Sequence, residues 1–279
     1  MSLARRGLLA SLAALLGGCS PARLLNTTVP REGYTRQADI AYGSLSRQKL
    51  DLYLPDTPRA DGKAVIFFYG GSWDSGSKDD YLFVAQALAS RGITTIIADY
   101  RLYPEVRFPA FLEDAAQATR WAADRVGASN LFVMGHSAGA HIALMLAANT
   151  TYLSQAGVDR MKLAGVIGLA GPYDFLPLKS AKLIDIFGGA NRPEIQAITF
   201  AQAPLPPALL LHGTADTTVL PRNSENLAAA GRRAGAPVEL KLYPEVGHID
   251  IVVAFSDLFK KRATTREDVL AYIGASRSS

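Results

Sequence analysis

The stretch LFVMGHSAGAHIALMLAA, residues 131–148, decides the fold. Its first five residues form a continuous apolar run, which is typical of a strand buried on both faces. Its last eleven residues, Ala138–Ala148, are apolar all round, which predicts a buried helix. Between the two lies Gly135-His136-Ser137-Ala138-Gly139, which matches G-x-S-x-G, a sharp strand-to-helix turn that exposes its serine. Strand, turn and helix together indicate a nucleophilic serine at residue 137.

A serine needs a general base, and the chain offers only four histidines. His248 follows the last predicted core strand, in a loop that can reach over the edge of the sheet. His136 and His141 lie in the turn and on its helix, and the His136 side chain is expected to point away from Ser137. His212 ends a buried strand and is expected to be a satisfied structural histidine. We therefore expect His248 to be the base.

The acid that orients this histidine is expected between the serine and the histidine in the chain. Asp216 follows the strand before the last one, in Leu211-His-Gly-Thr-Ala-Asp216. There it can select the histidine tautomer and stabilise the imidazolium. Asp250 is the competing acid, but two residues from His248 it is expected to be a surface charge.

Backbone donors for an oxyanion are expected in Tyr69-Gly-Gly-Ser-Trp73, which follows a buried strand. Two adjacent glycines let this backbone come close to a substrate. The candidate donors are the N–H groups of Gly71, Ser72 and Ala138. Trp73 is expected to pack or to shape a pocket rather than to donate.

Outward from this motif, buried strands alternate with helical patterns, which predicts βαβ crossovers and a mostly parallel sheet with helices on both faces. The expected strands are Ala38–Tyr42, Lys49–Leu54, Ala64–Tyr69, Thr94–Ala98, Leu131–Gly135, Leu163–Leu169, Ala208–His212 and Val238–Tyr243, of which the first two form a hairpin. The expected helices are Tyr81–Arg91, Phe111–Val126, Ala138–Ala148, Asn223–Arg233 and Arg266–Ile273.

The segment 172–207 interrupts this rhythm after the sixth strand. It contains several prolines and short helical pieces, and loops of this length are usually functional. We interpret it as a small cap over the carboxyl edge of the sheet, where α/β sheets bind ligands. Its apolar residues are expected either to line an acyl pocket or simply to pack the cap: Phe175, Leu176, Leu178, Ile184 and Phe187.

Composition excludes several classes. The 279 residues are 49% hydrophobic and 19% charged, which is typical of a globular protein and not of a disordered or collagen-like one. One cysteine, Cys19, excludes an internal disulfide and a cysteine-based metal site. The net charge is only +4, and no basic run exceeds Lys260–Arg262, so no nucleic-acid partner is expected. Residues 71–78 are no phosphate loop, because Ser77 separates Gly76 from Lys78.

The first residues have the form of an export signal: Arg5-Arg6, a short apolar run and Leu16-Gly-Gly-Cys19. The last four resemble the lipoprotein box of bacteria. This resemblance implies a signal peptide at residues 1–18 and a lipidated Cys19 that carries diacylglycerol and palmitate-type acyl chains. Since no aspartate follows Cys19, export to the outer membrane, facing the periplasm, is expected. The alternative is an ordinary cleaved signal with an incidental cysteine. Residues 19–37 are interpreted as a tether and 38–279 as the catalytic domain.

Over residues 38–275 the chain resembles a known family. It is similar to α/β-hydrolases, and most of all to hormone-sensitive-lipase-like carboxylesterases and to arylformamidases. Their H-G-G-G-W, D-Y-R-L and G-x-S-A-G motifs correspond to Tyr69–Trp73, Asp99–Leu102 and Gly135–Gly139. Tyr69 stands for the usual histidine and Ser72 for the third glycine, and both changes keep the backbone donors.

The resemblance implies hydrolysis of small-molecule carboxylic esters through an acyl-enzyme, with no metal or organic cofactor. An arylformamidase or other amide hydrolase would use the same residues, so this alternative stays open. A non-catalytic binding module on the same scaffold is the alternative from another class. The oligomeric state is not specified by the sequence.

Overall fold

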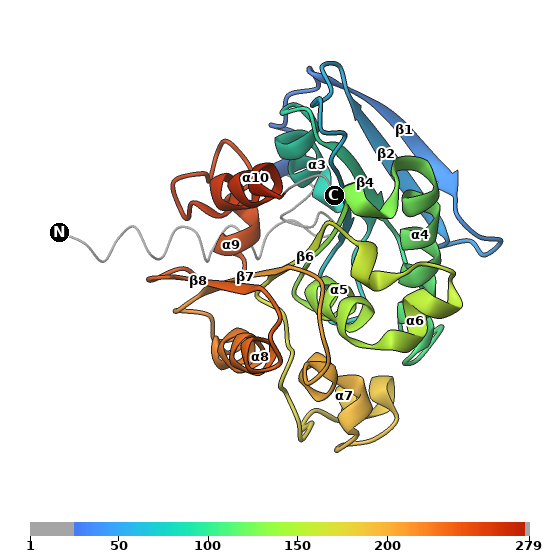
Figure 1. The fold of residues 1–279 in the computed structure, drawn as a ribbon, viewed down its shortest axis with the longest axis vertical. Helices are drawn as coiled ribbons and strands as arrows, with labels where there is room; N and C mark the ends of the chain where they lie inside the picture. The colour runs from blue at the N-terminus through green and yellow to red at the C-terminus, as the bar shows by residue number, and fades with distance from the viewer. Residues whose placement is uncertain (1–24, 277–279) are drawn as a thin grey trace, which may run out of the picture.

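One eight-stranded sheet organises the computed structural model, which describes residues 25–276 (Figure 1). The strands are β1 (Tyr34–Ala41), β2 (Lys49–Pro55), β3 (Ala64–Phe68), β4 (Thr94–Ala98), β5 (Leu131–His136), β6 (Gly165–Leu169), β7 (Ala208–Gly213) and β8 (Val238–Tyr243). Their order across the sheet is β1-β2-β4-β3-β5-β6-β7-β8. β1 and β2 pair antiparallel, β2 pairs antiparallel with β4, and all pairs from β4 to β8 are parallel. The predicted hairpin and mostly parallel sheet are therefore confirmed.

The strand order changes direction around β3. The chain runs from β3 to β4 on one side and then crosses back to β5 on the other side of β3. At such a reversal the loops that leave the carboxyl ends of the two strands diverge and open a crevice. The Gly-rich segment after β3 and the serine turn after β5 both lie at this point.

Helices cover both faces of the sheet, as predicted. Figure 1 shows α3 and α10 on one side and α4, α5 and α8 on the other. The helices are α3 (Leu82–Ala89), α4 (Ala110–Val126), α5 (Ala138–Ala148), α6 (Thr150–Gln155), α7 (Ala181–Phe187), α8 (Arg222–Arg233), α9 (Asp250–Val253) and α10 (Thr265–Ala275). The short α6 and α9 were not predicted, because one or two turns carry too little periodicity to stand out. No described helix is both long and apolar enough to cross a bilayer.

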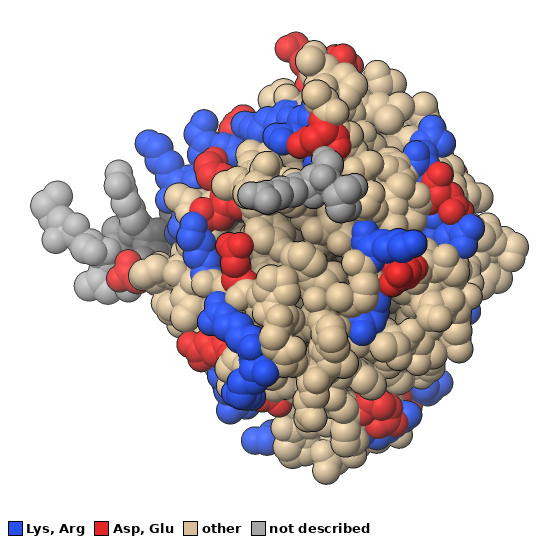
Figure 2. All heavy atoms as spheres, viewed as in Figure 1, with Lys and Arg blue, Asp and Glu red and all other residues tan. Residues whose placement is uncertain are grey.

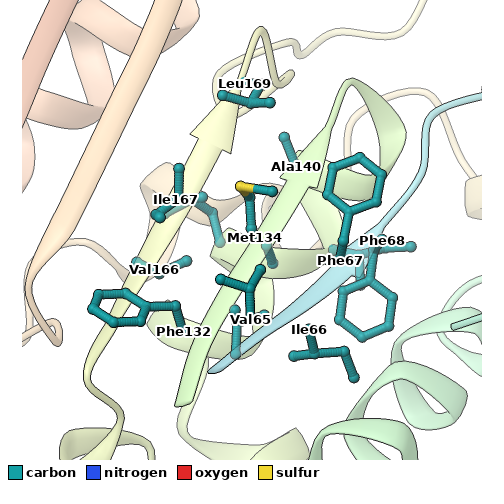
Figure 3. Close-up of a cluster of buried hydrophobic side chains, with 14 of the residues drawn as sticks. Val65, Ile66, Phe67, Phe68, Phe132, Met134, Ala140, Val166, Ile167 and Leu169 are labelled. Atoms are coloured by element: carbon teal, nitrogen blue, oxygen red, sulfur yellow. The ribbon is translucent and has the colours of Figure 1, made fainter. Parts of the chain in front are cut away.

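The core lies where the central strands meet the serine helix. Figure 3 shows side chains of β3, β5 and β6, among them Phe67, Met134 and Ile167, beside Ala140 of α5. All of these side chains are fully buried. Each large one contributes about 1.5–3 kcal/mol when it leaves water, so the centre of the sheet is a rigid support for the loops that it carries.

The N-terminal boundary corrects one prediction. Residues 25–37 are not a tether: Leu25 and Val29 are buried against the core, and β1 already begins at Tyr34. The Asn26 side chain donates to the carbonyl of Asp79 over 2.7 Å and accepts from the amide of Phe83 over 3.3 Å. These contacts join sequence positions more than fifty apart, which a short irregular segment cannot reveal. Cys19 and the predicted signal peptide, 1–18, lie outside the described residues.

The cap consists of α7 and two short 3-10 helices, η4 (Pro193–Ile195) and η5 (Ala197–Phe200), within the predicted segment 172–207. On the face that Figure 2 shows, Lys and Arg are interspersed with Asp and Glu. That face carries no extended basic stripe of the kind that binds nucleic acid.

Candidate active site

Ser137 sits on a strained turn between β5 and α5. Its backbone has φ 54° and ψ −119°, in a region that non-glycine residues rarely adopt. Its amide donates to the carbonyl of Leu169 over 2.9 Å, which ties the turn to β6. A Cβ at Gly139 would overlap the backbone of Phe68, and one at Gly135 would overlap that of Gly139. Only glycines therefore allow α5 to begin this close to β3.

His248 and Asp216 meet Ser137 at the carboxyl edge of the sheet. His248 Nε2 lies 2.9 Å from Ser137 Oγ, and His248 Nδ1 lies 2.7 Å from Asp216 Oδ2. The three residues are 111 and 32 positions apart in the chain. The structure thus brings together all three residues that the sequence singled out.

The partners of His248 determine where its proton lies. The Asp216 carboxylate only accepts, so Nδ1–H donates to it and Nε2 is left to accept from the Ser137 hydroxyl. Asp216 Oδ1 accepts from the amides of Thr218 and Val219, each over 2.9 Å. Burial opposes the charged form, but hydrogen bonds from His212, His248 and the Val219 amide outweigh it and hold the pKa of Asp216 well below its usual range. The acid is therefore a carboxylate wherever the protein is folded near neutral pH.

His212 is a satisfied strand-end histidine, as predicted, but it also touches the acid. Its Nδ1 lies 2.7 Å from Ser224 Oγ and its Nε2 lies 2.8 Å from the carbonyl of Val219. The same Nε2 lies 3.2 Å from Asp216 Oδ2. This second partner of the acid was not predicted from the sequence. The four-residue spacing between His212 and Asp216 was the available signal.

The other two histidines hold backbone segments next to the site by hydrogen bonds. His136 Nε2 lies 3.0 Å from the carbonyl of His248, and His141 Nε2 lies 2.6 Å from the carbonyl of Ile195 in the cap. Because a carbonyl only accepts, each Nε2 carries the proton. Burial lowers the pKa of His136 to about 3 and that of His141 to about 4, so both rings are neutral.

Asp250 is only partly exposed and supports the loop of the base. Its Oδ2 accepts from the amide of Gly247 over 3.1 Å, one residue before His248. It is not hydrogen-bonded to the His248 ring, whose Nδ1 belongs to Asp216. Asp250 is therefore not the orienting acid in this structure.

The segment after β3 lies against the serine. A Cβ on Gly70 would be 3.0 Å from the Ser137 Cβ. Gly71, Ser72 and Trp73 have φ values of 132°, 51° and 62°. Within residues 25–276, the N–H groups of Gly71, Ser72 and Ala138 donate to no protein acceptor, so they are free for another group. This agrees with the predicted donor positions.

Trp73 and the cap build an aromatic wall beside this segment. Trp73 is buried, with its ring centroid 4.8 Å from that of Phe187 and 5.1 Å from that of His141, both edge-on. Phe175 completes the wall at 6.3 Å from Trp73. Asp74 forms an ion pair with Lys182 of α7, which links the cap to the same segment. Trp73 packs, as predicted, and Phe187 is a fully buried core residue.

Comparisons with known proteins agree with this geometry. A family model described as BD-FAE matches residues 50–230. The chain is 31% identical over 270 residues to the probable isoprenylcysteine alpha-carbonyl methylesterase ICME of Oryza sativa subsp. japonica, covering 87% of this chain and 65% of that protein. It is 31% identical over 172 residues to the kynurenine formamidase of Danio rerio, covering 61% and 55%.

A solved hormone-sensitive lipase from a metagenome library has a TM-score of 0.74 and 22% identity to the chain, covering 92% of this chain and 91% of the other. At this identity the likeness concerns the fold alone. The chain spans less than two thirds of the length of the two sequence relatives. Because the family model covers more than half of the chain and the neighbouring structure shares its sheet and helices, the chain belongs to the BD-FAE family and has the α/β-hydrolase fold.

Proposed function

We propose that the protein is a serine hydrolase that cleaves small-molecule carboxylic esters through an acyl-enzyme. The observation that carries this proposal is the unbroken hydrogen-bond chain from Asp216 through His248 to Ser137. Free backbone donors at Gly71, Ser72 and Ala138 lie at the same edge of the sheet. A nucleophile, a base, an orienting acid and an oxyanion site are the parts that acyl transfer requires.

In the first half-reaction, Ser137 Oγ attacks the ester carbonyl while His248 Nε2 takes the hydroxyl proton. The carbonyl oxygen becomes an oxyanion, which the three backbone N–H groups stabilise. The ester C–O bond then breaks, and His248 returns the proton to the departing alcohol. Asp216 holds the ring and stabilises its positive charge throughout.

In the second half-reaction, water gives a proton to His248 and attacks the acyl-enzyme. The second tetrahedral intermediate uses the same N–H groups. Its collapse releases the carboxylic acid and returns the proton to Ser137 Oγ. Phe175, the half-buried member of the aromatic wall, is proposed to contact the acyl group, and hydrolysis rates across a series of ester chain lengths test this part.

The names of the relatives support ester hydrolysis first and amide hydrolysis second. The rice relative is named a methylesterase and the zebrafish relative a formamidase. The residues described serve both reactions, because both pass through the same tetrahedral oxyanion. Comparing kcat/KM for an aryl ester with that for the matching aryl formamide decides between them. A binding module without activity would neither turn over these substrates nor be labelled by a fluorophosphonate.

The decisive variant is Ser137→Ala, assayed with a chromogenic p-nitrophenyl ester. Loss of the nucleophile should lower kcat by about 10⁴–10⁶-fold, as in other serine hydrolases. Ser154→Ala, at an exposed position on α6, is the matched control and should keep full activity. Undiminished hydrolysis by the Ser137→Ala protein would overturn the proposed function.

We also propose that Cys19 is lipidated after removal of residues 1–18 and anchors the protein in the bacterial outer membrane, facing the periplasm. The support is the Leu16-Gly-Gly-Cys19 pattern after a basic start and a short apolar run, with no aspartate after Cys19. Several acyl chains hold a protein firmly, whereas one chain is marginal. Mass spectrometry of the mature N-terminus tests the anchor, and an unmodified cysteine would refute it.

A further inference from the structure

The segment after β3 needs outside support to keep its shape. We call this segment, Gly70–Ser77, the oxyanion loop. Its tip has three successive residues with positive φ, of which Ser72 and Trp73 are not glycines. Non-glycine residues in this region cost about 1–3 kcal/mol each and persist only when the surroundings hold them. Within the loop, only turn hydrogen bonds to the carbonyl of Gly71, from Asp74 and Ser75, oppose this strain.

Tyr69, the residue that precedes the loop, is fully buried and ends in a hydrogen-bond network. Its hydroxyl donates to Asp99 Oδ1 over 2.7 Å and accepts from Arg47 Nη2 over 2.8 Å. Burial raises the pKa of Tyr69 well above its usual range, so the phenol keeps its proton. Its ring stacks on Tyr100 at a centroid distance of 4.7 Å, and the Tyr100 hydroxyl donates to the carbonyl of Tyr69 over 2.7 Å.

The far end of the loop returns to the same side chains. Asp99 Oδ1 also accepts from the amide of Lys78 over 2.9 Å, and Arg47 Nη2 also donates to the carbonyl of Gly76 over 3.0 Å. A Cβ on Gly76 would lie 2.7 Å from the Tyr69 ring, so the returning backbone rests directly on that ring. Arg47, Tyr69 and Asp99 therefore hold both ends of the loop at one point.

We propose that Arg47, Tyr69 and Asp99 are positioning residues that keep the oxyanion loop in the shape in which the Gly71 and Ser72 N–H groups meet the transition state. The proposal rests on the proposed hydrolase function. It also assigns a task to the hydroxyl of the buried Tyr69 side chain. None of the three side chains is hydrogen-bonded to Ser137, His248 or Asp216.

This role makes a kinetic difference that a purely structural role does not. Oxyanion donors act mainly on the transition state, so loosening them lowers kcat and leaves KM nearly unchanged. Tyr69→Phe removes only the hydroxyl and keeps the stacked ring. We expect it to lower kcat for a p-nitrophenyl ester by about 10–100-fold, somewhat less than the loss of a whole oxyanion donor, with KM within about twofold. The rate of fluorophosphonate labelling of Ser137 should fall by the same factor.

Tyr243→Phe is the matched control. The Tyr243 hydroxyl donates to Asp268 Oδ2 over 2.6 Å, on the side of α10 and away from the oxyanion loop. Tyr243→Phe removes the same kind of phenol–carboxylate hydrogen bond as Tyr69→Phe. It should lower the melting temperature and leave kcat nearly unchanged. Equal losses of kcat in the two variants, in step with their melting temperatures, would overturn the positioning role.

Arg47→Lys is the second variant, because it keeps the charge but removes the fork that reaches Tyr69 and Gly76 together. Arg47→Lys should also lower kcat at constant KM. Arg47, Tyr69 and Asp99 together are called the clamp. The double variant Arg47→Lys/Tyr69→Phe should lose no more kcat than about the larger of the two single losses, since both changes release the same clamp. If Ser137→Ala is inactive while Tyr69→Phe and Arg47→Lys keep full kcat, the clamp alone is refuted. If Ser137→Ala stays active, the proposed function fails and the clamp with it.

Discussion

The two halves of the site are built by different means. On the nucleophile half, the Ser137 turn and the oxyanion loop depend on backbone: positive φ values and glycines against which other backbone packs directly. On the proton-transfer half, Asp216 and His248 depend on side-chain hydrogen bonds between loops after β7 and β8. The Ser137 turn should therefore fail when atoms are added, whereas the proton-transfer half and the ends of the oxyanion loop should fail when side-chain donors or acceptors are removed. The following experiments test that distinction.

The largest effect is expected on the proton-transfer half, from Asp216→Asn. The carboxamide has one oxygen, so it cannot accept from the Thr218 and Val219 amides on one side and from His248 on the other, as the carboxylate does. When its NH2 group faces His248, Nδ1 must accept and the proton lies on Nε2, which can then no longer accept from Ser137. We expect kcat for a p-nitrophenyl ester to fall by about 10⁴-fold with little change in KM, as for the equivalent change in other triads. Asp250→Asn, which changes the carboxylate that holds Gly247, is the control and should lose less than about tenfold. Equal losses would show that loop support, not orientation of the ring, is the role of Asp216.

The next effect is expected on the nucleophile half, from Gly139→Ala. Its methyl group would overlap the backbone of Phe68, so α5 must move away from β3 and carry Ser137 with it. We expect kcat/KM to fall by at least about 100-fold, because a displacement of 1 Å is enough for such a loss. Gly274→Ala on α10, where the nearest atoms are 3.7 Å away, should stay active and be no less stable. Full activity of Gly139→Ala would contradict the steric account.

A smaller effect is expected from His212→Asn. The variant loses the Nε2–H group shared between Val219 and Asp216, while Asp216 keeps its bonds to His248 and to two backbone amides. We expect kcat to fall about tenfold, the effect of about one ordinary hydrogen bond. Steady-state kinetics beside Asp216→Asn measures the difference. A loss as large as that of Asp216→Asn would mean that His212 carries the orientation of the acid.

The last effect concerns acid stability rather than rate and belongs to the nucleophile half. Burial lowers the pKa of His136 to about 3 and that of His141 to about 4. Between these values and about 6.5 the unfolded chain binds protons that the folded chain does not, so stability falls as the pH falls. We expect each histidine to remove about 1.4 kcal/mol per pH unit from the free energy of unfolding in this range.

Urea unfolding of wild type and His136→Gln between pH 4 and pH 7 measures this slope. Gln can still donate toward the His248 carbonyl but does not titrate, so the variant should show a shallower slope. An identical slope in both proteins would show that His136 is protonated in the folded state or does not contribute.

Much of the fold followed from simple periodicity. The buried strands from β3 to β7 were expected from short apolar runs, because strands covered on both faces need apolar residues at every position. β8 was also expected as a core strand, but it is an edge strand and most of its residues are not buried. The early start of β1 was missed, since most of this edge strand is exposed and its sequence lacks that pattern. The packing of Leu25 and Val29 was missed for a related reason: their partners lie far along the chain.

The candidate site divides in the same way. Serine, acid and base could be named because G-x-S-x-G stands between a strand and a helix, and because few histidines and acids follow later strands. The sequence did not predict the contact of His212 with Asp216, nor the hydrogen bonds that join Arg47, Tyr69 and Asp99. Each of them depends on which side chains of neighbouring loops come within 3 Å or so of one another, which periodicity does not encode.

By itself, the order of residues determined that this chain forms a mostly parallel sheet with a G-x-S-x-G turn between a strand and a helix, because burial and turn chemistry are local properties of short stretches. Only the tertiary structure decided how closely His248 approaches Ser137, which groups surround Asp216 and which side chains hold the oxyanion loop. The reason is physical: the sheet brings the carboxyl ends of strands far apart in sequence to one edge, and hydrogen bonds form or fail there over fractions of an ångström.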